Sequence, residues 1–97
     1  MFLSVPGFSP NLALVYKTTT AITVSWTPDP SDTNGYVVYA TSDAETVTQQ
    51  VEGGSQNTTA LEGLRGGTTY NITVRAYQDL LGPASSPISV QTSGISP

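Results

Sequence analysis

The stretch LEGLRGGTTYNITVRAY, residues 61–77, decides the fold of this chain. Two leucines and a cluster of glycines lead into Tyr70, and from Tyr70 onward apolar and polar residues alternate as in a half-buried strand. This is the sequence pattern of a tyrosine corner, in which the ring is buried and its hydroxyl forms a hydrogen bond with a backbone group a few residues upstream. The stretch therefore predicts a long strand over residues 69–78, fixed at its start to a loop that crosses between two sheets.

On either side of this stretch, short alternating runs are bounded by turn residues, and no segment has a convincing helical period. Short strands separated by frequent turns are typical of a β-sandwich. The sequence predicts an all-β fold, a seven-stranded antiparallel Greek-key β-sandwich of immunoglobulin-like type, with the first, second and fifth strands in one sheet. The expected strands cover residues 11–16, 21–26, 36–41, 46–51, 58–61, 69–78 and 86–92.

The alternation within these strands identifies the candidate core. The clearest strand turns Ile22, Val24 and Trp26 inward, and the first strand has Leu12 and Leu14 on one face. Large aromatic side chains contribute most to such a core because each buries a large apolar area. The residues expected to be most important for the core are Trp26, Leu64, Tyr70, Ile72 and Val74.

Charge limits the classes of partner. Only 10% of the 97 residues are charged, the formal net charge is −4, and the three cations, Lys17, Arg65 and Arg75, are scattered along the chain. Three separated cations cannot form the basic stripe that nucleic acid or an anionic lipid surface requires. We therefore expect no nucleic-acid binding and no direct membrane contact, and a protein as any partner.

The residue types present also limit the chemistry. Histidine and cysteine are both absent, which excludes a Ser-His-Asp triad, a thiol nucleophile and a His- or Cys-ligated metal. Two pairs of loop acids remain, Asp29 with Asp32 and Asp43 with Glu45. Such acids usually cap local backbone groups, although calcium is an alternative that needs more converging oxygen ligands. We expect no enzymatic activity, no catalytic residues, no cofactor and no metal.

Taken together, these motifs resemble those of a fibronectin type III domain over about residues 9–92. Trp26 stands where that family has its core tryptophan, and Tyr70 where it has its corner tyrosine. No cysteine pair flanks Trp26, which favours this family over true immunoglobulin domains. The resemblance rests on residues 10–12, 22–26, 35–39, 61–70 and 85–90.

The resemblance implies a role in binding, spacing or adhesion. Residues 1–8 are interpreted as a leader, 9–92 as the domain and 93–97 as a linker. The expected function is that of a non-catalytic protein-interaction and spacer module of a larger extracellular or cell-surface protein. The isolated domain is expected to be a monomer. Alternatives are a structural spacer attached to a secreted enzyme and an engineered or intracellular member of the family.

Two surfaces are candidates for partner binding. The first is the hairpin loop of residues 78–84, which lacks the Arg-Gly-Asp tripeptide associated with adhesion in this family but contains two adjacent leucines. The second is the outer face of the third strand and of the long strand, where residues could instead only stabilise the sheet through cross-strand pairs. Tyrosine and arginine are enriched at interface hot spots. The candidate residues are Asp79, Leu80 and Leu81 in the loop, and Val37, Tyr39, Arg75 and Tyr77 on the face.

Two N-glycosylation sequons also occur, Asn57-Thr58-Thr59 and Asn71-Ile72-Thr73. Asn57 is expected in a turn and Asn71 at an outward position of the long strand, so both side chains should face solvent. A glycan on Asn71 would partly mask the face that carries Val37, Tyr39 and Tyr77, and the two hypotheses therefore compete.

Overall fold

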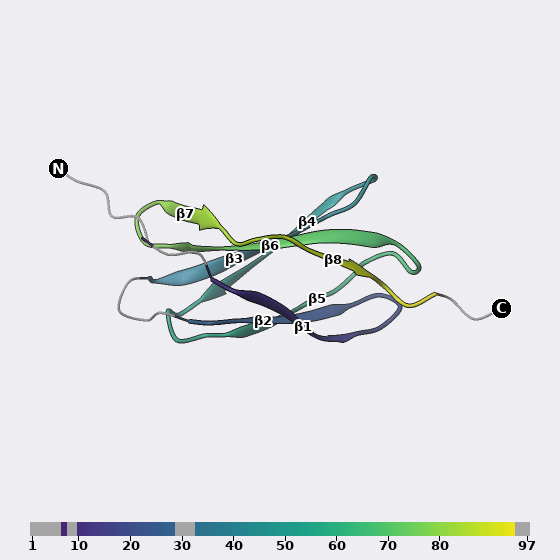
Figure 1. Cartoon of the computed structure of the whole chain (residues 1–97), viewed down its shortest axis with the longest axis horizontal. Coiled ribbons are helices and arrows are strands. Elements are labelled where there is room, and N and C mark those ends of the chain that lie inside the picture. The colour runs from purple at the N-terminus through teal and green to yellow at the C-terminus, as the bar shows by residue number, and fades with distance from the viewer. Residues whose placement is uncertain (1–6, 8–9, 29–32, 95–97) are drawn as a thin grey trace.

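The computed structural model describes Gly7, residues 10–28 and residues 33–94. All the regular secondary structure in these residues is β-strand (Figure 1). The strands form two sheets with the orders β1-β2-β5 and β4-β3-β6-β7, and β8 pairs with β6 in the second sheet. All pairs are antiparallel. The predicted β-sandwich and its division between the sheets are confirmed. The strands are β1 Leu12–Lys17, β2 Ile22–Trp26, β3 Gly35–Thr41, β4 Thr46–Glu52, β5 Thr58–Leu61, β6 Thr69–Tyr77, β7 Leu81–Ala84 and β8 Ile88–Gln91.

The core lies between the inner faces of the two sheets. Because side chains alternate along a strand, every second residue of β2 and β6 is buried. Trp26 and Tyr36 pack against each other with ring centroids 5.2 Å apart. The Trp26 indole N–H donates to the Gln56 carbonyl at 3.0 Å, and the Tyr36 hydroxyl to the Gly54 carbonyl at 2.8 Å. All five residues expected to be most important for the core are buried there.

The structure has one strand more than the sequence predicts, because β7 forms within the predicted loop of residues 78–84, ahead of the last predicted strand. β7 and β8 both pair with β6. Between β7 and β8 the regular pairing with β6 is interrupted, and Ser85 bonds to Val74 of β6 through its backbone and its side chain. The Ser85 N–H donates to the Val74 carbonyl at 2.9 Å, and the Ser85 hydroxyl accepts the Val74 N–H at 3.0 Å. Proline at position 87 has no N–H to offer to a ladder. The predicted loop of residues 78–84 is therefore a tight turn followed by β7.

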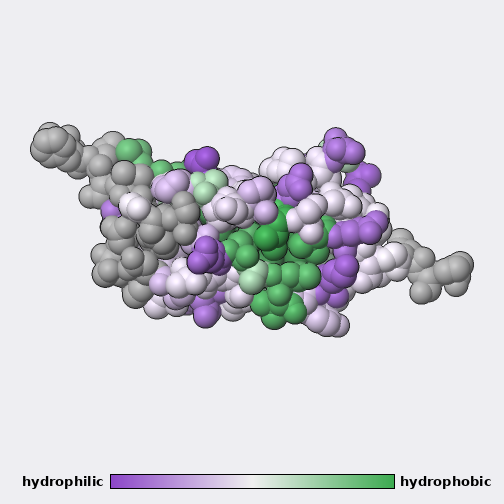
Figure 2. Space-filling model, in the orientation of Figure 1, coloured by the Kyte–Doolittle hydropathy of each residue, from purple (hydrophilic) through white to green (hydrophobic). Residues whose placement is uncertain are grey.

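The first strand is an exposed edge. Leu12 packs against the core, but Leu14 is 44% exposed, Val15 58% and Tyr16 65%. The pairing of β1 with β2 shifts register between Leu14 and Tyr16, so the strand bulges at Val15. Figure 2 shows apolar surface in the middle of this side of the molecule, where β1 runs in Figure 1.

The described chain enters and leaves the sandwich at opposite ends. β1 runs away from the end that holds the β6–β7 turn, and β8 runs toward the other end (Figure 1). The turn between β3 and β4 lies at this second end, together with the tyrosine corner between β5 and β6. The arrangement places the leucine-bearing turn at the end where the chain enters.

Candidate protein-interaction surface

The outer face of the five-stranded sheet carries the four predicted face residues on its two central strands. Val37 of β3 pairs with Arg75 of β6, and Tyr39 of β3 pairs with Thr73 of β6. Directly paired residues point to the same side of a sheet. These side chains and that of Tyr77 are half-buried. Such intermediate exposure is typical of neighbouring side chains on the outer face of a sheet.

The turn between β6 and β7 that carries Leu80 and Leu81, here called the leucine turn, is continuous with this face. Tyr77 pairs with Leu81 across β6 and β7, so Leu81 lies beside Tyr77 and not at a free loop tip. Leu80 precedes it in the turn, and the two leucines are 47% and 43% exposed respectively. Asp79 is also exposed in the same turn. The two separately predicted surfaces are thus one surface, here called the tyrosine face: Val37, Tyr39, Arg75, Tyr77, Leu80 and Leu81.

Tyr77 is held in place from several sides. Its backbone N–H donates to the Thr33 hydroxyl at 3.0 Å, and that hydroxyl lies 2.7 Å from the Tyr77 carbonyl oxygen. The Gln50 amide donates to the Tyr77 hydroxyl at 3.2 Å. A Cβ on Gly35 would lie 2.6 Å from the Tyr77 Oη, so the glycine makes room for the phenol. A surface fixed in this way loses little side-chain freedom when a partner binds.

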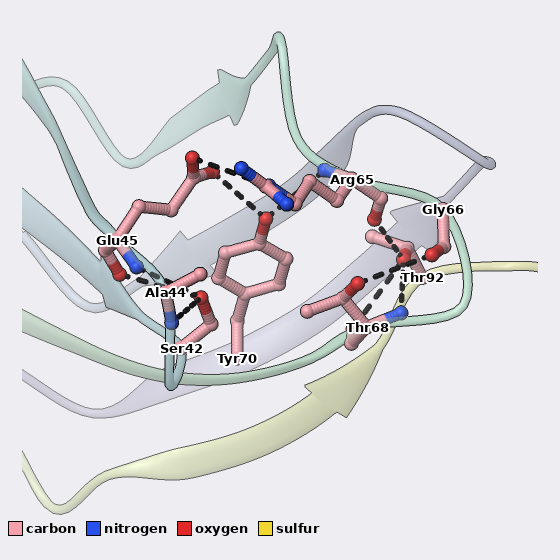
Figure 3. Close-up of polar contacts among 8 residues, drawn as sticks. All are labelled: Ser42, Ala44, Glu45, Arg65, Gly66, Thr68, Tyr70 and Thr92. Atoms are coloured by element: carbon pink, nitrogen blue, oxygen red, sulfur yellow. Dashed lines mark hydrogen bonds and ion pairs between the residues drawn. The ribbon is translucent and has the colours of Figure 1, made fainter.

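At the opposite end of the sandwich, the tyrosine corner is present and extends further than predicted (Figure 3). The Tyr70 hydroxyl accepts the Arg65 N–H at 3.0 Å, which is the predicted upstream backbone contact. The same hydroxyl donates to Glu45 Oε2 at 3.0 Å, and Glu45 Oε1 lies 3.7 Å from Arg65 Nε. Gly63 and Gly67 adopt φ angles of 72° and 59°, which side-chain-bearing residues rarely adopt, and so shape the turn.

The structure changes the interpretation of the Asp43 and Glu45 pair. Ser42, not an acid, caps this turn, because its hydroxyl accepts the N–H groups of Ala44 at 3.2 Å and Glu45 at 3.3 Å. Glu45 instead reaches across to the corner. Its partner Tyr70 lies 25 residues away in sequence, and no local pattern signals that contact.

A buried threonine that the sequence analysis did not single out closes the same end of the sandwich. The Thr92 hydroxyl donates to the Arg65 carbonyl and accepts the Thr68 N–H at 3.0 Å (Figure 3). The Thr92 N–H donates to the Thr68 carbonyl at 3.0 Å. These bonds attach the chain after β8 to the corner before β6.

The described residues offer little for metal chemistry. No group of three or more acids in the described part of the chain could hold a metal ion. Asp29 and Asp32, the other predicted pair, lie outside the described residues. None of the described segments forms a helix long and apolar enough to cross a bilayer.

Both sequon asparagines are exposed. Asn57 lies between β4 and β5, where its backbone carbonyl accepts the Trp26 N–H at 2.9 Å. Asn71 lies on the outer face of β6, paired with Thr41 of β3 and Ser89 of β8. Asn71 therefore shares its sheet face with Tyr39 and Arg75.

The sandwich, its corner tyrosine and its core tryptophan define an immunoglobulin-like β-sandwich domain. The family profile of the fibronectin type III domain matches residues 4–91. The chain belongs to the fibronectin type III family.

Among curated proteins, Tenascin-N of Mus musculus is 40% identical over 69 residues, which cover 70% of this chain and 4% of that protein. Among solved structures, the FN1–FN3 domains of chicken contactin (CNTN1) superpose with a TM-score of 0.81 at 25% identity, covering 91% of this chain and 31% of that one. The FN5 domain of Drosophila Lar gives 0.77 at 28% identity, covering 92% and 98%. These relatives are extracellular or cell-surface proteins.

Proposed function

We propose that this domain is a non-catalytic protein-interaction and spacer module of a larger extracellular or cell-surface protein, and that it binds protein through the tyrosine face. The similarity to domains of Tenascin-N, contactin and Lar supports the setting. The observation that carries the binding role is the pairing of Tyr77 with Leu81, which joins an aromatic sheet face to an apolar turn.

The composition of the tyrosine face suits a protein partner. Tyrosine and arginine dominate interface hot spots because they combine apolar area with directed polar groups. Leu80 and Leu81 add apolar area at the rim. Tyr77 is held by the bond of its backbone N–H to Thr33 and by the bond that its hydroxyl accepts from Gln50. The face carries one cation, Arg75, next to the half-buried Val37.

The spacing role is supported by the path of the chain. Because β1 and β8 direct the chain through opposite ends of the sandwich, domains joined on either side would be held apart by its length (Figure 1). The leucine turn lies at the entry end, where it could contact a domain joined before this one. The tyrosine face would thus take part either in a neighbouring-domain contact or in a contact with another protein.

The test uses the 97-residue chain fused to a dimeric carrier and presented to an array of purified ectodomains that includes this chain itself. Any partner found is then titrated against three double variants. Leu80→Ser with Leu81→Ser removes the apolar rim, and Tyr39→Ser with Arg75→Glu alters the sheet part of the face. The matched control is Leu14→Ser with Val15→Ser, at positions of similar exposure on the other sheet.

We expect each tyrosine-face variant to weaken binding at least tenfold and the control to bind as the parent chain does. Circular dichroism must show that all three variants remain folded. Loss of binding only in the Leu14 and Val15 variant would move the interaction to β1. A partner that binds all variants equally would contradict the tyrosine face as the binding site and leave only the spacing role.

A further inference from the structure

Asn71 is exposed although β6 is a central strand of its sheet. Its neighbour Ile72 is fully buried, and the alternation of β6 therefore fixes the Asn71 side chain on the outer face. Asn71 pairs with Thr41 on one side and with Ser89 on the other, and all three residues are exposed.

The surroundings of Asn71 leave room for a bulky substituent. Thr69 and Thr73 lie on the same face two residues before and after it along β6. The four nearest positions on the face thus carry only short hydroxyl side chains. The nearest larger side chains on the face, Tyr39 and Gln91, lie diagonally from Asn71, each opposite a threonine of β6.

We propose that Asn71 is an N-glycosylation site, within the sequon Asn71-Ile72-Thr73. The proposal rests on the extracellular setting of the proposed function, because the donor is a lipid-pyrophosphate-linked oligosaccharide of the secretory pathway. The amide nitrogen Nδ2 attacks the anomeric carbon, a C–N bond forms, and the bond from that carbon to the pyrophosphate oxygen breaks. The amide gives up one proton, the lipid pyrophosphate leaves, and no oxidant or reductant is needed.

The position of this glycan has a consequence for binding. Tyr77 lies six residues along β6 from Asn71, or about 20 Å at the usual rise of a strand, and Leu81 of β7 pairs with it. Tyr39, in contrast, pairs with Thr73, only two residues from Asn71. A glycan on Asn71 therefore covers the Tyr39 part of the tyrosine face and leaves the leucine turn open. Access of a large partner is restricted to the entry end of the sandwich.

The experiment is secretion of the full 97-residue chain, with a cleavable signal peptide, from animal cells that also glycosylate a reporter sequon. The intact mass is measured before and after enzymatic removal of N-glycans, and enzymatic release in heavy-oxygen water marks each modified asparagine as aspartate. Variants Asn71→Gln and Thr73→Ala each destroy this sequon, and Asn57→Gln destroys only the other.

We expect the Asn71 peptide to carry the label, and Asn71→Gln and Thr73→Ala each to lose the mass of one glycan. Asn57→Gln should retain the Asn71 label. A folded, secreted chain without label at Asn71 would overturn the proposal, as would a glycan lost only in Asn57→Gln. The mass readout does not depend on any partner, so failure of the proposed binding role would be seen separately, in the titrations of the tyrosine-face variants.

Discussion

Tyr70 connects three separate parts of the chain through one hydroxyl. It receives a backbone N–H from the turn before β6 and donates to Glu45 in the turn between β3 and β4. Hydrogen bonds to a charged group contribute more to stability than bonds between neutral groups, typically about 1.5–3 kcal/mol. The hydroxyl therefore links the crossover between the sheets to the end of the β3–β4 hairpin.

Tyr70→Phe should lower the free energy of unfolding by about 1–3 kcal/mol, because it leaves the Arg65 N–H and the Glu45 carboxylate without this partner. Urea melts of the two chains measure the change. Glu45→Gln should cost less, since an amide oxygen still accepts the tyrosine hydroxyl and the exposed ion pair with Arg65 contributes only about 0.2–1 kcal/mol. Superimposable melts of Tyr70→Phe and the parent chain would show that the corner bond contributes nothing.

Gly35→Ala is expected to destabilise the domain by about 1–3 kcal/mol, the usual cost of overpacking. The new Cβ would lie 2.5 Å from the Val51 carbonyl oxygen and 2.6 Å from the Tyr77 Oη. Thermal unfolding followed by tryptophan fluorescence measures the loss. Gly94→Ala is the matched control, since a Cβ there meets nothing within 4 Å. Equal melting temperatures for the two variants would contradict the close packing of Tyr77 over Gly35.

At the scale of single residues, the contacts that could be predicted from the sequence are those encoded locally. The Tyr70 bond to Arg65 spans five residues and has a recognisable motif, so it could be predicted. The contact with Glu45 and the burial of Thr33 and Thr92 could not, because a threonine in a polar stretch looks the same whether it faces solvent or a carbonyl. These polar contacts depend on segments that meet only after the sheets have formed.

At the scale of the elements, the interruption between β7 and β8 is bridged by a side chain: the Ser85 hydroxyl takes the place of a backbone acceptor for β6. Ser85 supplies both its N–H and its hydroxyl to Val74, so β6 keeps its hydrogen bonds where the partner strand is interrupted. Ser85 and Val74 are both buried, which keeps water from taking over this role.

Ser85→Ala should therefore cost about 1–3 kcal/mol, the price of a buried N–H without an acceptor. Ser85→Thr retains the hydroxyl and should cost less. Denaturant melts give the stability, and amide hydrogen exchange at Val74 gives the local effect, which should be faster exchange in Ser85→Ala. Unchanged protection of the Val74 N–H in Ser85→Ala would show that the hydroxyl is not its essential acceptor.

The strands themselves were largely predictable, because most of them alternate with a period of two. β5 has the predicted bounds, and β2, β3, β4 and β6 differ from prediction by one residue at one end. The exceptions lie at the sheet edges. The exposure of Leu14 follows a register shift in β1, and β7 forms in a stretch predicted as a loop, with Ser85 bonding to Val74 where the ladder to β8 is interrupted. Neither a bulge nor a side-chain substitute for a ladder bond changes the pattern of apolar residues.

For the molecule as a whole, calcium should leave the melting temperature unchanged. A ligand at 100 times its Kd would add about 2.7 kcal/mol. For a domain of this size such a gain corresponds to a rise of about 10 °C or more. Differential scanning calorimetry with millimolar calcium or with a chelator measures the difference. A clear rise that Asp29→Asn with Asp32→Asn abolishes would establish a calcium site at those acids.

The candidate surface was only partly predictable at this scale. The sequence gives the residues of the tyrosine face, since alternation assigns Val37, Tyr39 and Tyr77 to one side of the sheet. Their continuity with the leucine turn depends on the register that pairs Tyr77 with Leu81, which appears only once β7 is seen to be a strand.

The path of the chain through β1 and β8 also determines how the domain would carry mechanical load. The two strands belong to different sheets, and tension on the flanking chain would pull them in opposite directions along their own axes. The hydrogen bonds from β1 to β2 and from β8 to β6 lie across that direction, so they would be sheared together instead of opening one after another. The Lys17 ammonium, which donates to the Gln91 carbonyl at 2.8 Å, joins the two loaded strands directly. A module built in this way would hold its length under stretching along the axis of a chain of domains.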